Sequence, residues 1–234
     1  MKNSVSFTLD ELHNDKILPV DKPRDWTSFD VVQKLRYASR VKKVGHAGTL
    51  DPFATGLLLI CFSRATKKVP QLMELEKEYV ASIKLGTETD TDDLTGKPVA
   101  RHEVPDISIS RLQDVLQSYI GEIDQIPPMY SALKKQGQRL YELARRGQTV
   151  EREPRRVRIK ELELLRFEKD VLDIRVVCSR GTYIRALARD IGRDLGCGGH
   201  LQALVRTRIG DYHLDDAWEL PALVEEIKSQ RSKQ

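Results

Sequence analysis

The alternation of apolar and polar residues along this chain predicts an ordered series of strands. Residues 79–85 alternate strictly, which is typical of a half-buried strand with Tyr79 on the buried face. Residues 57–62 are apolar without interruption, which predicts a strand buried on both faces. The full set of predicted strands is 17–20, 57–62, 79–85, about 156–167, 171–178 and about 201–210.

Helical patterns lie between these strands. Thr27, followed three residues later by Asp30, forms a capping-box pattern that predicts a helix to about Arg40. Residues 1–16 are polar and predict a loose lead-in, and 87–98 an acidic loop. Further helices are predicted at about 65–75, from Ser110 to about 119, at 138–146 with Gly147 as C-cap, at 182–195, and within 211–234. Adjacent strands with interspersed helices favour an α+β fold around a largely antiparallel sheet.

The segment 45–56 stands out because it combines three glycines with one histidine and one carboxylate. Gly45 and Gly48 are expected to allow backbone conformations or close approaches that a side chain would forbid. Pro52 disfavours helical backbone at Asp51, so this carboxylate is expected on an extended or turn backbone. The segment is therefore a candidate reactive loop, although an aspartate in such a loop also serves as a simple turn residue.

Composition narrows the class of protein. The 234 residues suffice for one large or two small domains, and 40% apolar with 32% charged residues is typical of a soluble globular protein. No stretch reaches eighteen apolar residues and no signal core is present, so we expect a cytoplasmic protein. Three cysteines without a CxxC pair indicate reduced thiols.

Cofactor and metal motifs are not recognisable in the sequence. It contains no GxGxxG, no phosphate-binding GxxxxGK[ST] and no HExxH pattern. The acidic stretch 90–96 resembles a calcium loop, but Leu94 occupies the third ligand position and Arg101 the closing position. We therefore expect neither a cofactor nor a metal.

Positive charge is concentrated in one segment. Residues 134–160 contain ten basic and three acidic residues, a net charge of +7, whereas the whole chain carries only +4. The remainder of the chain is therefore slightly acidic. A charge run is often only a solvated face, but this concentration also suits a surface that follows a phosphate backbone.

Several motifs in fixed order resemble one enzyme family. The sequence GHAGTLDPFATGLL at 45–58, preceded by VDKP at 20–23, is similar to the catalytic signature of TruB-type tRNA pseudouridine synthases. The similarity continues through KEY at 77–79, TDTD at 89–92, QIPPMYSA at 125–132 and CSRGTYIR at 178–185. It extends from about residue 17 to about residue 210, which covers most of the chain.

The resemblance implies a fold, an activity and partners. The implied fold is a mixed, mainly antiparallel sheet flanked by helices, with a central active-site cleft. The implied activity converts uridine 55 of the tRNA TΨC loop to pseudouridine after base flipping, without a cofactor. We expect one catalytic domain over 1–234, with an RNA-clamping insertion at about 127–156 and without a C-terminal PUA-type domain. We further expect a monomer that binds the T arm of tRNA without a guide RNA.

The resemblance also assigns residue roles. Asp51 corresponds to the carboxylate that acts at the glycosidic bond, either by attacking C1′ or by removing the C2′ proton, and the sequence leaves both routes open. Tyr79 corresponds to the tyrosine that stacks on the base and takes the C5 proton. Arg185 corresponds to the arginine that keeps the acid ionised. Read without the resemblance, Tyr79 suits a core position and Arg185 a helix surface.

Three further residues match substrate-binding positions of the family. His46 corresponds to the residue inserted into the RNA loop, Lys22 packs behind the active-site loop, and Leu204 lines the base pocket. Outside the resemblance, His46 would be an ordinary loop histidine and Leu204 a core leucine. The predicted RNA-binding residues are Lys134, Lys135, Arg139, Arg145, Arg146, Arg155 and Arg156.

Two other functions remain open at this stage. A guide-dependent pseudouridylase would use the same catalytic residues on another RNA, and the expected lack of a PUA-type domain argues against it. An RNA-folding chaperone would need the basic surface but no carboxylate. Exchange of Asp51 for asparagine separates catalysis from chaperone activity.

Overall fold

The computed structural model describes residues 5–131, 134–135, 138–139, 143, 146–148 and 150–233. Contacts between residues divide the chain into two compact units. Unit 1 comprises Met1–Tyr79 and Leu204–Gln234, and unit 2 comprises Val80–Ala203. Strands β4 (Lys77–Leu85) and β12 (Gly199–Ile209) each run from one unit into the other. The expected single domain over 1–234 stays a prediction.

Unit 1 is built on strand β3 (Thr55–Ser63), which contains the predicted apolar run. β3 pairs antiparallel with β1 (Asp15–Lys22) along its whole length and with β2 (Val44–Ala47) near its end. Its first residues pair in parallel with β12, where Val205 lies opposite Thr55. Two short strands complete the sheet, β13 (Tyr212–His213) beside β12 and β14 (Trp218–Glu219) parallel to β1.

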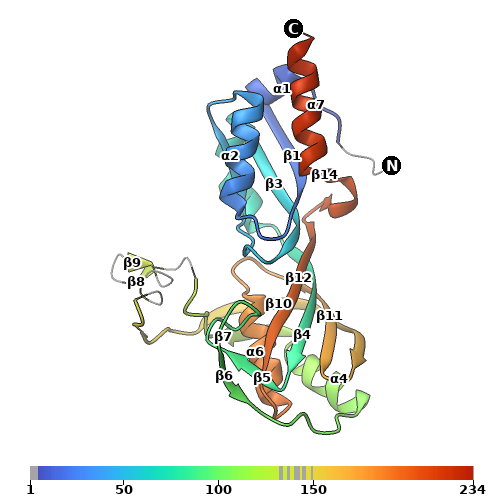
Figure 1. The fold of residues 1–234 in the computed structure, drawn as a ribbon. Coiled ribbons are helices and arrows are strands. Elements are labelled where there is room, and N and C mark those ends of the chain that lie inside the picture. The colour runs from blue at the N-terminus through green and yellow to red at the C-terminus, as the bar shows by residue number, and fades with distance from the viewer. Residues whose placement is uncertain are drawn as a thin grey trace. The chain divides into compact units, whose positions relative to one another are not determined.

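Both faces of β3 are buried, which explains why its sequence is apolar without alternation. On one face Leu58, Ile60 and Phe62 pack in a cluster with side chains of the helices α1, α2 and α7, and Figure 1 shows α2 and α7 beside β1 and β3. On the other face Leu57 and Leu59 pack with the segment that follows β3. The helices of this unit are α1 (Leu9–Asn14), α2 (Ser28–Ser39), η1 (Arg64–Lys68), α3 (Val69–Glu74), η2 (Leu214–Asp216) and α7 (Leu220–Ser232).

Two capping boxes define the first helices of unit 1. The predicted box of α2 is confirmed, because the Asp30 amide donates to Thr27 Oγ1 at 3.0 Å and the Thr27 amide to Asp30 Oδ2 at 2.9 Å. A second box, formed by Thr8 and Glu11, begins α1. The expected loose lead-in over 1–16 is therefore wrong at its end, since this box and the burial of Leu12 in the core stabilise a short helix there.

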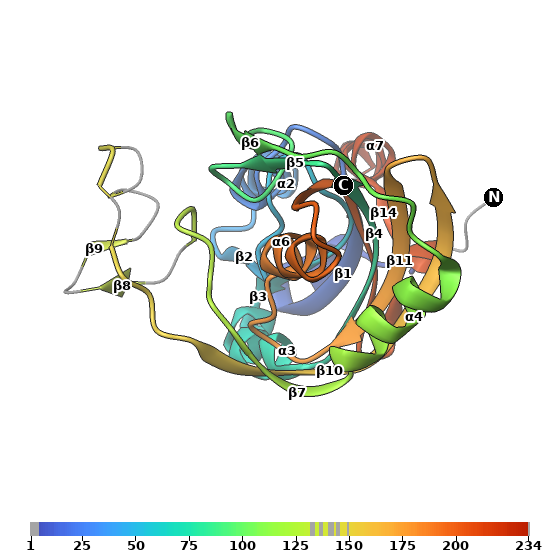
Figure 2. The ribbon, with the colours of Figure 1, turned by 90° about the horizontal axis from the view of Figure 1, so that it is seen from below.

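Unit 2 contains a curved sheet with the strand order β4, β11, β10, β7. β10 pairs antiparallel with both β11 and β7, and Figure 2 shows these strands curving around helix α6. The elements of this unit are β5 (Thr87–Thr89), β6 (Pro98–Arg101), α4 (Ile109–Ser118), β7 (Gly121–Gln125), β8 (Lys134–Lys135), β9 (Gln138–Arg139), β10 (Arg155–Glu168), β11 (Val171–Cys178) and α6 (Ile184–Asp194). The predicted hairpin and the α+β class with a mainly antiparallel sheet are confirmed.

Three local predictions need correction. Helix α4 is capped by Ser108, whose Oγ accepts from the Arg111 amide at 3.2 Å, and not by Ser110. The ends of the expected acidic loop pair as β5 and β6, because Thr87 lies opposite Arg101. In the helix expected over 138–146, Gln138 and Arg139 instead form β9.

The end of that expected helix is described only in part. Gly147 has a φ of 73°, and the amides of Arg146 and Gln148 both donate to the Leu143 carbonyl, as at a helix C-terminus. Residues 140–142, 144 and 145 of this stretch lie outside the described residues.

The α2 cap provides a test of the fold of unit 1. We expect Thr27→Ala to lower the free energy of unfolding by about 1 kcal/mol, because it removes the side-chain acceptor of the first helical turn. Urea unfolding followed by tryptophan fluorescence measures this, since the chain's two tryptophans, Trp26 and Trp218, both lie in unit 1. Thr27→Ser keeps the hydroxyl and serves as the control. Equal unfolding of the two variants would contradict the cap.

Candidate active site

The glycine-rich segment connects β2 to β3, and two of its glycines adopt left-handed backbone conformations. Gly48 has a φ of +87° and Gly56 a φ of +101°. A Cβ on Gly56 would lie 2.4 Å from the carbonyl oxygen of Arg206, so only glycine lets β3 and β12 approach here. A Cβ on Gly45 would meet only Thr66 Cγ2 at an ordinary 3.8 Å. The expectation for Gly48 is confirmed, whereas the expected requirement at Gly45 is wrong.

Lys22 holds the loop through hydrogen bonds to backbone carbonyls. Its side chain is fully buried, and Nζ donates to the carbonyls of Pro23 at 2.8 Å, Trp26 at 2.7 Å and Pro52 at 3.1 Å. The Pro52 carbonyl also accepts from the Asp25 amide at 2.9 Å. The three ammonium hydrogens thus join the end of β1 to the residue after Asp51.

Ser28 fixes the residue before Asp51. Its buried hydroxyl, in the first turn of α2, accepts from the Leu50 amide at 3.0 Å. The Asp51 carbonyl accepts from the Ala54 amide at 3.1 Å, which closes a turn. The half-buried Asp51 carboxylate therefore projects from a backbone that is anchored on both sides.

Arg206 is the residue that the sequence analysis missed. Its side chain is only 1% exposed, its Nε donates to the Leu57 carbonyl at 2.7 Å and its Nη2 to the Gly48 carbonyl at 3.1 Å. Its guanidinium also forms a side-chain hydrogen bond with Tyr79. One buried cation thus contacts the loop, strand β3 and the predicted catalytic tyrosine. The available signal was its place two residues after Leu204, on the buried face of an alternating strand.

Charges within unit 1 favour an ionised carboxylate. Burial lowers the pKa of Lys22 to about 8, while the negative charges of Asp25 and Asp51 oppose this shift. The attraction between Lys22 and Asp51 is mutual, so the ammonium favours the carboxylate form of Asp51. Arg206 acts in the same region, since its charge also lowers the pKa of Lys22.

His46 lies on β2, and its surroundings favour the neutral imidazole. Burial, followed by the positive charge of Arg206, lowers the pKa of its imidazole. Its Nδ1 is buried and has no hydrogen-bond partner among the described residues. Tyr79 and Leu204 are also placed in unit 1, and their side chains are 9% and 6% exposed. His46, Lys22, Asp51, Tyr79 and Leu204 therefore all belong to one compact unit.

Arg185 belongs to unit 2, where helix α6 directs it toward the acidic segment. Its Nη1 donates to the Thr91 carbonyl at 3.2 Å and lies 3.5 Å from the Asp93 carboxylate, and its Nη2 donates to the Tyr130 carbonyl at 2.9 Å. Its side chain is buried, unlike that of a surface helix arginine. Its predicted partnership with Asp51 joins residues of different units and stays a prediction.

The acidic segment is held by arginine and by hydroxyl groups. Arg189, one turn after Arg185, donates through Nη1 to Asp92 Oδ2 at 2.9 Å. Burial raises the pKa of Asp92, while the charges of Arg189 and Arg185 oppose this shift. Asp93 Oδ1 accepts from the hydroxyls of Thr91 and Thr95 at 2.8 and 2.6 Å. Among the described residues, no group of three or more histidine, cysteine or acidic side chains could hold a metal ion.

The predicted RNA-binding residues occupy several places in unit 2. Lys134, Lys135 and Arg139 belong to the β8–β9 pair, and Arg145 lies outside the described residues. Arg146 is exposed, as are Arg155 and Arg156 at the start of β10. Arg156 lies 3.9 Å from the carboxylate of Glu122 and 3.6 Å from that of Asp124, in an exposed group with little net stabilisation. Binding of RNA by these residues stays a prediction.

Comparison with known proteins identifies the class. The chain matches a crystal structure of an archaeal box H/ACA sRNP Nop10–Cbf5 complex with a TM-score of 0.71 and 27% identity, over 95% of this chain and 57% of that chain. A Cbf5–Nop10–Gar1 complex matches with a TM-score of 0.74 and 28% identity, over 96% of this chain and 61% of that chain. The chain thus spans less than two thirds of these solved chains, which share its fold.

Sequence comparison extends this result. Residues 36–184 match the model of the N-terminal domain of TruB family pseudouridylate synthases, and residues 185–234 match that of the tRNA pseudouridylate synthase B C-terminal domain. A protein of Francisella tularensis subsp. tularensis named tRNA pseudouridine synthase B is 52% identical over 91% of this chain and 70% of its own length. A protein of the same name from Francisella philomiragia is 51% identical over 91% of this chain and 70% of its own length.

The matched models and the fold define a pseudouridylate synthase. Within that class, the chain belongs to the TruB family. In the part of the chain that the structure describes, no helix is long and apolar enough to cross a membrane.

Arg206 can be tested against a neighbouring arginine. We expect Arg206→Met to lower the free energy of unfolding by roughly 2–5 kcal/mol, because two buried carbonyls lose their donor. Arg208→Met is the control, since the Arg208 side chain is 19% exposed and water can replace part of its ion pair with Glu76 and its hydrogen bond to the Gly210 carbonyl, so the loss should be smaller, about 1 kcal/mol. Urea unfolding of both variants measures the difference. Equal losses would contradict the role of Arg206.

The buried Lys22 predicts a pH dependence of stability. Folded Lys22 loses its proton near pH 8, whereas the unfolded residue keeps it to about 10.5. Between these values the unfolded state binds more protons, so the free energy of unfolding should rise with pH relative to Lys22→Met. The free energy of unfolding should rise by at most about 1.4 kcal/mol for each unit that separates the folded and unfolded pKa values of Lys22. Urea unfolding of both proteins between pH 8 and 10.5 measures this change. A free energy of unfolding that falls with pH relative to Lys22→Met would show that the folded state favours the charged form.

Proposed function

We propose that this protein isomerises uridine 55 in the TΨC loop of tRNA to pseudouridine. The observation that carries the proposal is the placement of Asp51 on a loop anchored at Leu50 by Ser28, at Pro52 by Lys22 and at Gly48 by Arg206. This loop contains the signature segment. Relatives that are 51–52% identical to the chain are named tRNA pseudouridine synthase B. A carboxylate held rigidly in an electropositive, half-buried place suits chemistry at an anomeric carbon.

The reaction rearranges the substrate without net gain or loss of atoms. The N1–C1′ bond of uridine breaks, the base turns, and C5 bonds to C1′ while its proton leaves and N1 takes one up. Asp51 serves either as the nucleophile at C1′ or as the base at C2′, and both routes require the ionised form. Lys22 supplies a neighbouring positive charge that favours this form without touching the substrate.

Tyr79 is proposed to stack on the base and to remove the C5 proton. Its side chain is mostly buried and is hydrogen-bonded to Arg206. A guanidinium beside a phenol stabilises the phenolate, which is the form that accepts a proton. Arg206 is then a positioning residue, because it acts through Tyr79 and through the loop backbone.

The remaining residues of the proposed site bind and extrude the nucleotide. His46 is proposed to enter the RNA loop and to occupy the gap left by a flipped base, and burial and the charge of Arg206 favour its neutral form because they lower the pKa of the imidazole. Leu204 provides an apolar wall of the base pocket. Arg185 is proposed to pair with Asp51, and the basic residues of 134–156 are proposed to clamp the RNA arm.

The proposed partner is the T arm of tRNA, bound by a monomer in the cytoplasm without a guide RNA. Structures of Cbf5 complexes share the fold at 27–28% identity. The relatives of higher identity carry the tRNA name. This difference favours tRNA over guide-dependent recognition.

The proposal is tested with an unmodified tRNA transcript labelled with tritium at uridine C5. We expect the purified protein in buffer to release one tritium per tRNA from the TΨC loop, and Asp51→Asn to abolish the release. Asp215→Asn is the matched control, because Asp215 is an exposed residue of the same unit that lies outside the reactive loop and its supports. It should retain most of the activity.

Two outcomes would overturn the proposal. Tritium release by Asp51→Asn would refute the role of the carboxylate. Tight, salt-sensitive RNA binding without release by the unaltered protein would instead favour a chaperone or a guide-dependent enzyme.

A further inference from the structure

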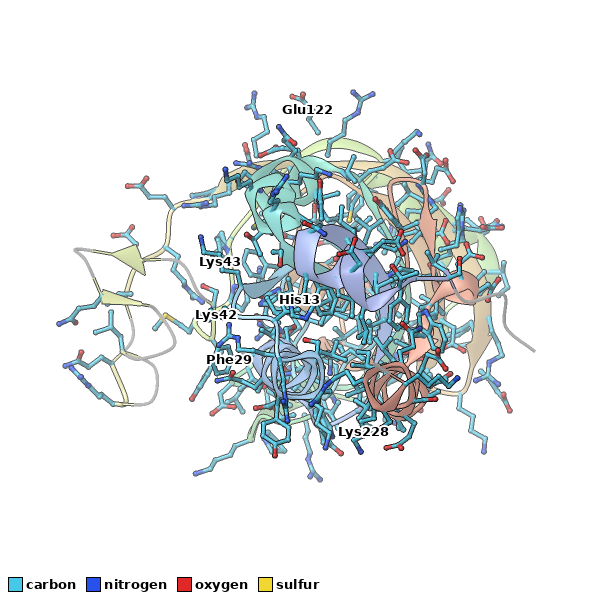
Figure 3. All side chains as sticks on the ribbon, turned by 90° about the horizontal axis from the view of Figure 1, so that it is seen from above. His13, Phe29, Lys42, Lys43, Glu122 and Lys228 are labelled. Atoms are coloured by element: carbon cyan, nitrogen blue, oxygen red, sulfur yellow. The ribbon has the colours of Figure 1, made fainter. Side chains whose placement is uncertain are left out.

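A second concentration of positive charge lies in unit 1, outside the proposed site. Residues 34–43 contain five basic residues and no acidic one. They form the second half of α2 and its connection to β2, where Lys42 and Lys43 are exposed beside α2 in Figure 3. Arg36, Tyr37 and Arg40 of this stretch line a surface pocket together with Arg231 of α7. We call these four residues the α2–α7 patch.

Helix capping explains only part of this arrangement. Arg231 Nη1 donates to the Ala38 carbonyl at 2.8 Å, and Arg36 Nη2 donates to the Val44 carbonyl at 3.1 Å. Cations at helix C-termini commonly bind such carbonyls. A guanidinium has five N–H donors, however, and these bonds, together with one from Arg36 Nη1 to Gln33 Oε1 at 3.1 Å, use only some of them. The guanidiniums of Arg36 and Arg231 are thus held in place while some of their N–H donors remain unused by these bonds.

Neighbouring carboxylates do not neutralise the patch. On α7, Glu225 pairs with Lys228 at 2.7 Å and Glu226 accepts from Gln230 at 2.8 Å, both along their own helix. On α2, Asp30 is engaged in the capping box at the opposite end of the helix. The described acidic groups of these two helices therefore have partners outside the patch.

Tyr37 gives the patch its chemical character. Its side chain is 86% exposed although it adjoins three arginines. An exposed aromatic ring among guanidiniums suits nucleic acid, because arginine binds phosphate in a bidentate manner and bases stack on tyrosine. An acidic protein partner would satisfy the arginines but would leave this ring without its preferred contact.

The patch is also close in the chain to the proposed RNA contact. Arg36 binds the carbonyl of Val44, two residues before His46, and two residues span about 7 Å at most. Both features belong to unit 1. RNA engaged at His46 would therefore come within reach of the patch.

We propose that the α2–α7 patch is a second RNA-binding site, in which arginines contact phosphates and Tyr37 stacks on an unpaired base. This inference rests on the proposed function, because it takes RNA as the substrate. It adds to that function a contact surface in unit 1, separate from the basic segment 134–156 of unit 2.

The test measures binding of fluorescently labelled, unmodified tRNA transcript by anisotropy over a salt series. All proteins carry Asp51→Asn, which prevents turnover. Arg40→Asn removes one charge, and its φ of 58° suits asparagine. The matched control is Lys169→Asn, an exposed residue of unit 2 with a φ of 57°. Tyr37→Ala removes the ring and Tyr37→Phe keeps it.

We expect Arg40→Asn to weaken binding and to reduce the slope of log K against log salt by about 0.7–0.9. We expect Tyr37→Ala to weaken binding by about fivefold or more with an unchanged slope, because base stacking contributes about 1–3 kcal/mol. Tyr37→Phe and Lys169→Asn should bind as the parent does.

Binding by Arg40→Asn and Tyr37→Ala that equals the Lys169→Asn control would overturn the inference. An equal loss in Lys169→Asn would also overturn it, because the effect would then follow total charge. The tritium assay with the unaltered Asp51 protein is run on the same transcript. Release of tritium together with unchanged binding by the patch variants refutes the patch alone, whereas absence of release refutes the proposed function.

Discussion

The buried guanidinium of Arg206 is the interaction on which the candidate active site depends. A charge removed from water is costly unless its donors are satisfied, and here they bind the carbonyls of Leu57 and Gly48 and the side chain of Tyr79. Gly56 makes this possible, because a Cβ at that position would collide with the Arg206 backbone. One residue therefore couples the candidate reactive loop, the central strand and Tyr79.

Lys22 and Ser28 anchor the loop at the two residues that flank Asp51. The three carbonyls around Lys22 Nζ and the Leu50 amide on Ser28 are groups that the loop could not satisfy internally. Their satisfaction by side chains of β1 and α2 fixes the backbone on both sides of Asp51. A catalytic carboxylate benefits from such fixation, because preorganised charge needs no rearrangement during reaction.

In unit 2, arginines serve a comparable purpose. Arg185 and Arg189 lie one helical turn apart on α6 and both bind the acidic segment, Arg189 through the half-buried carboxylate of Asp92. The charges compensate one another in a place where isolated carboxylates would be costly. Arginine thus organises the candidate functional segment in each unit, through carbonyls in unit 1 and through both carbonyls and carboxylates in unit 2.

Elements whose cause is local could be predicted from the sequence. The alternation of 79–85, the apolar run in β3 and the Thr27–Asp30 capping box each depend on side chains a few residues apart, and each prediction was confirmed. The order of the signature motifs likewise determined the family. A helix cap was displaced from Ser110 to Ser108, because both serines suit the role and packing selects between them.

Features that depend on distant contacts could not be predicted, because only the folded chain brings their partners together. Short elements such as α1 and β14 exist because the core buries Leu12 and because β1 offers a strand partner. Arg206 lies 150 residues after Gly56 in the chain, and only the pairing of β12 with β3 brings the two together. No local pattern can show that an arginine in a strand is buried, because its burial depends on acceptors supplied by other segments.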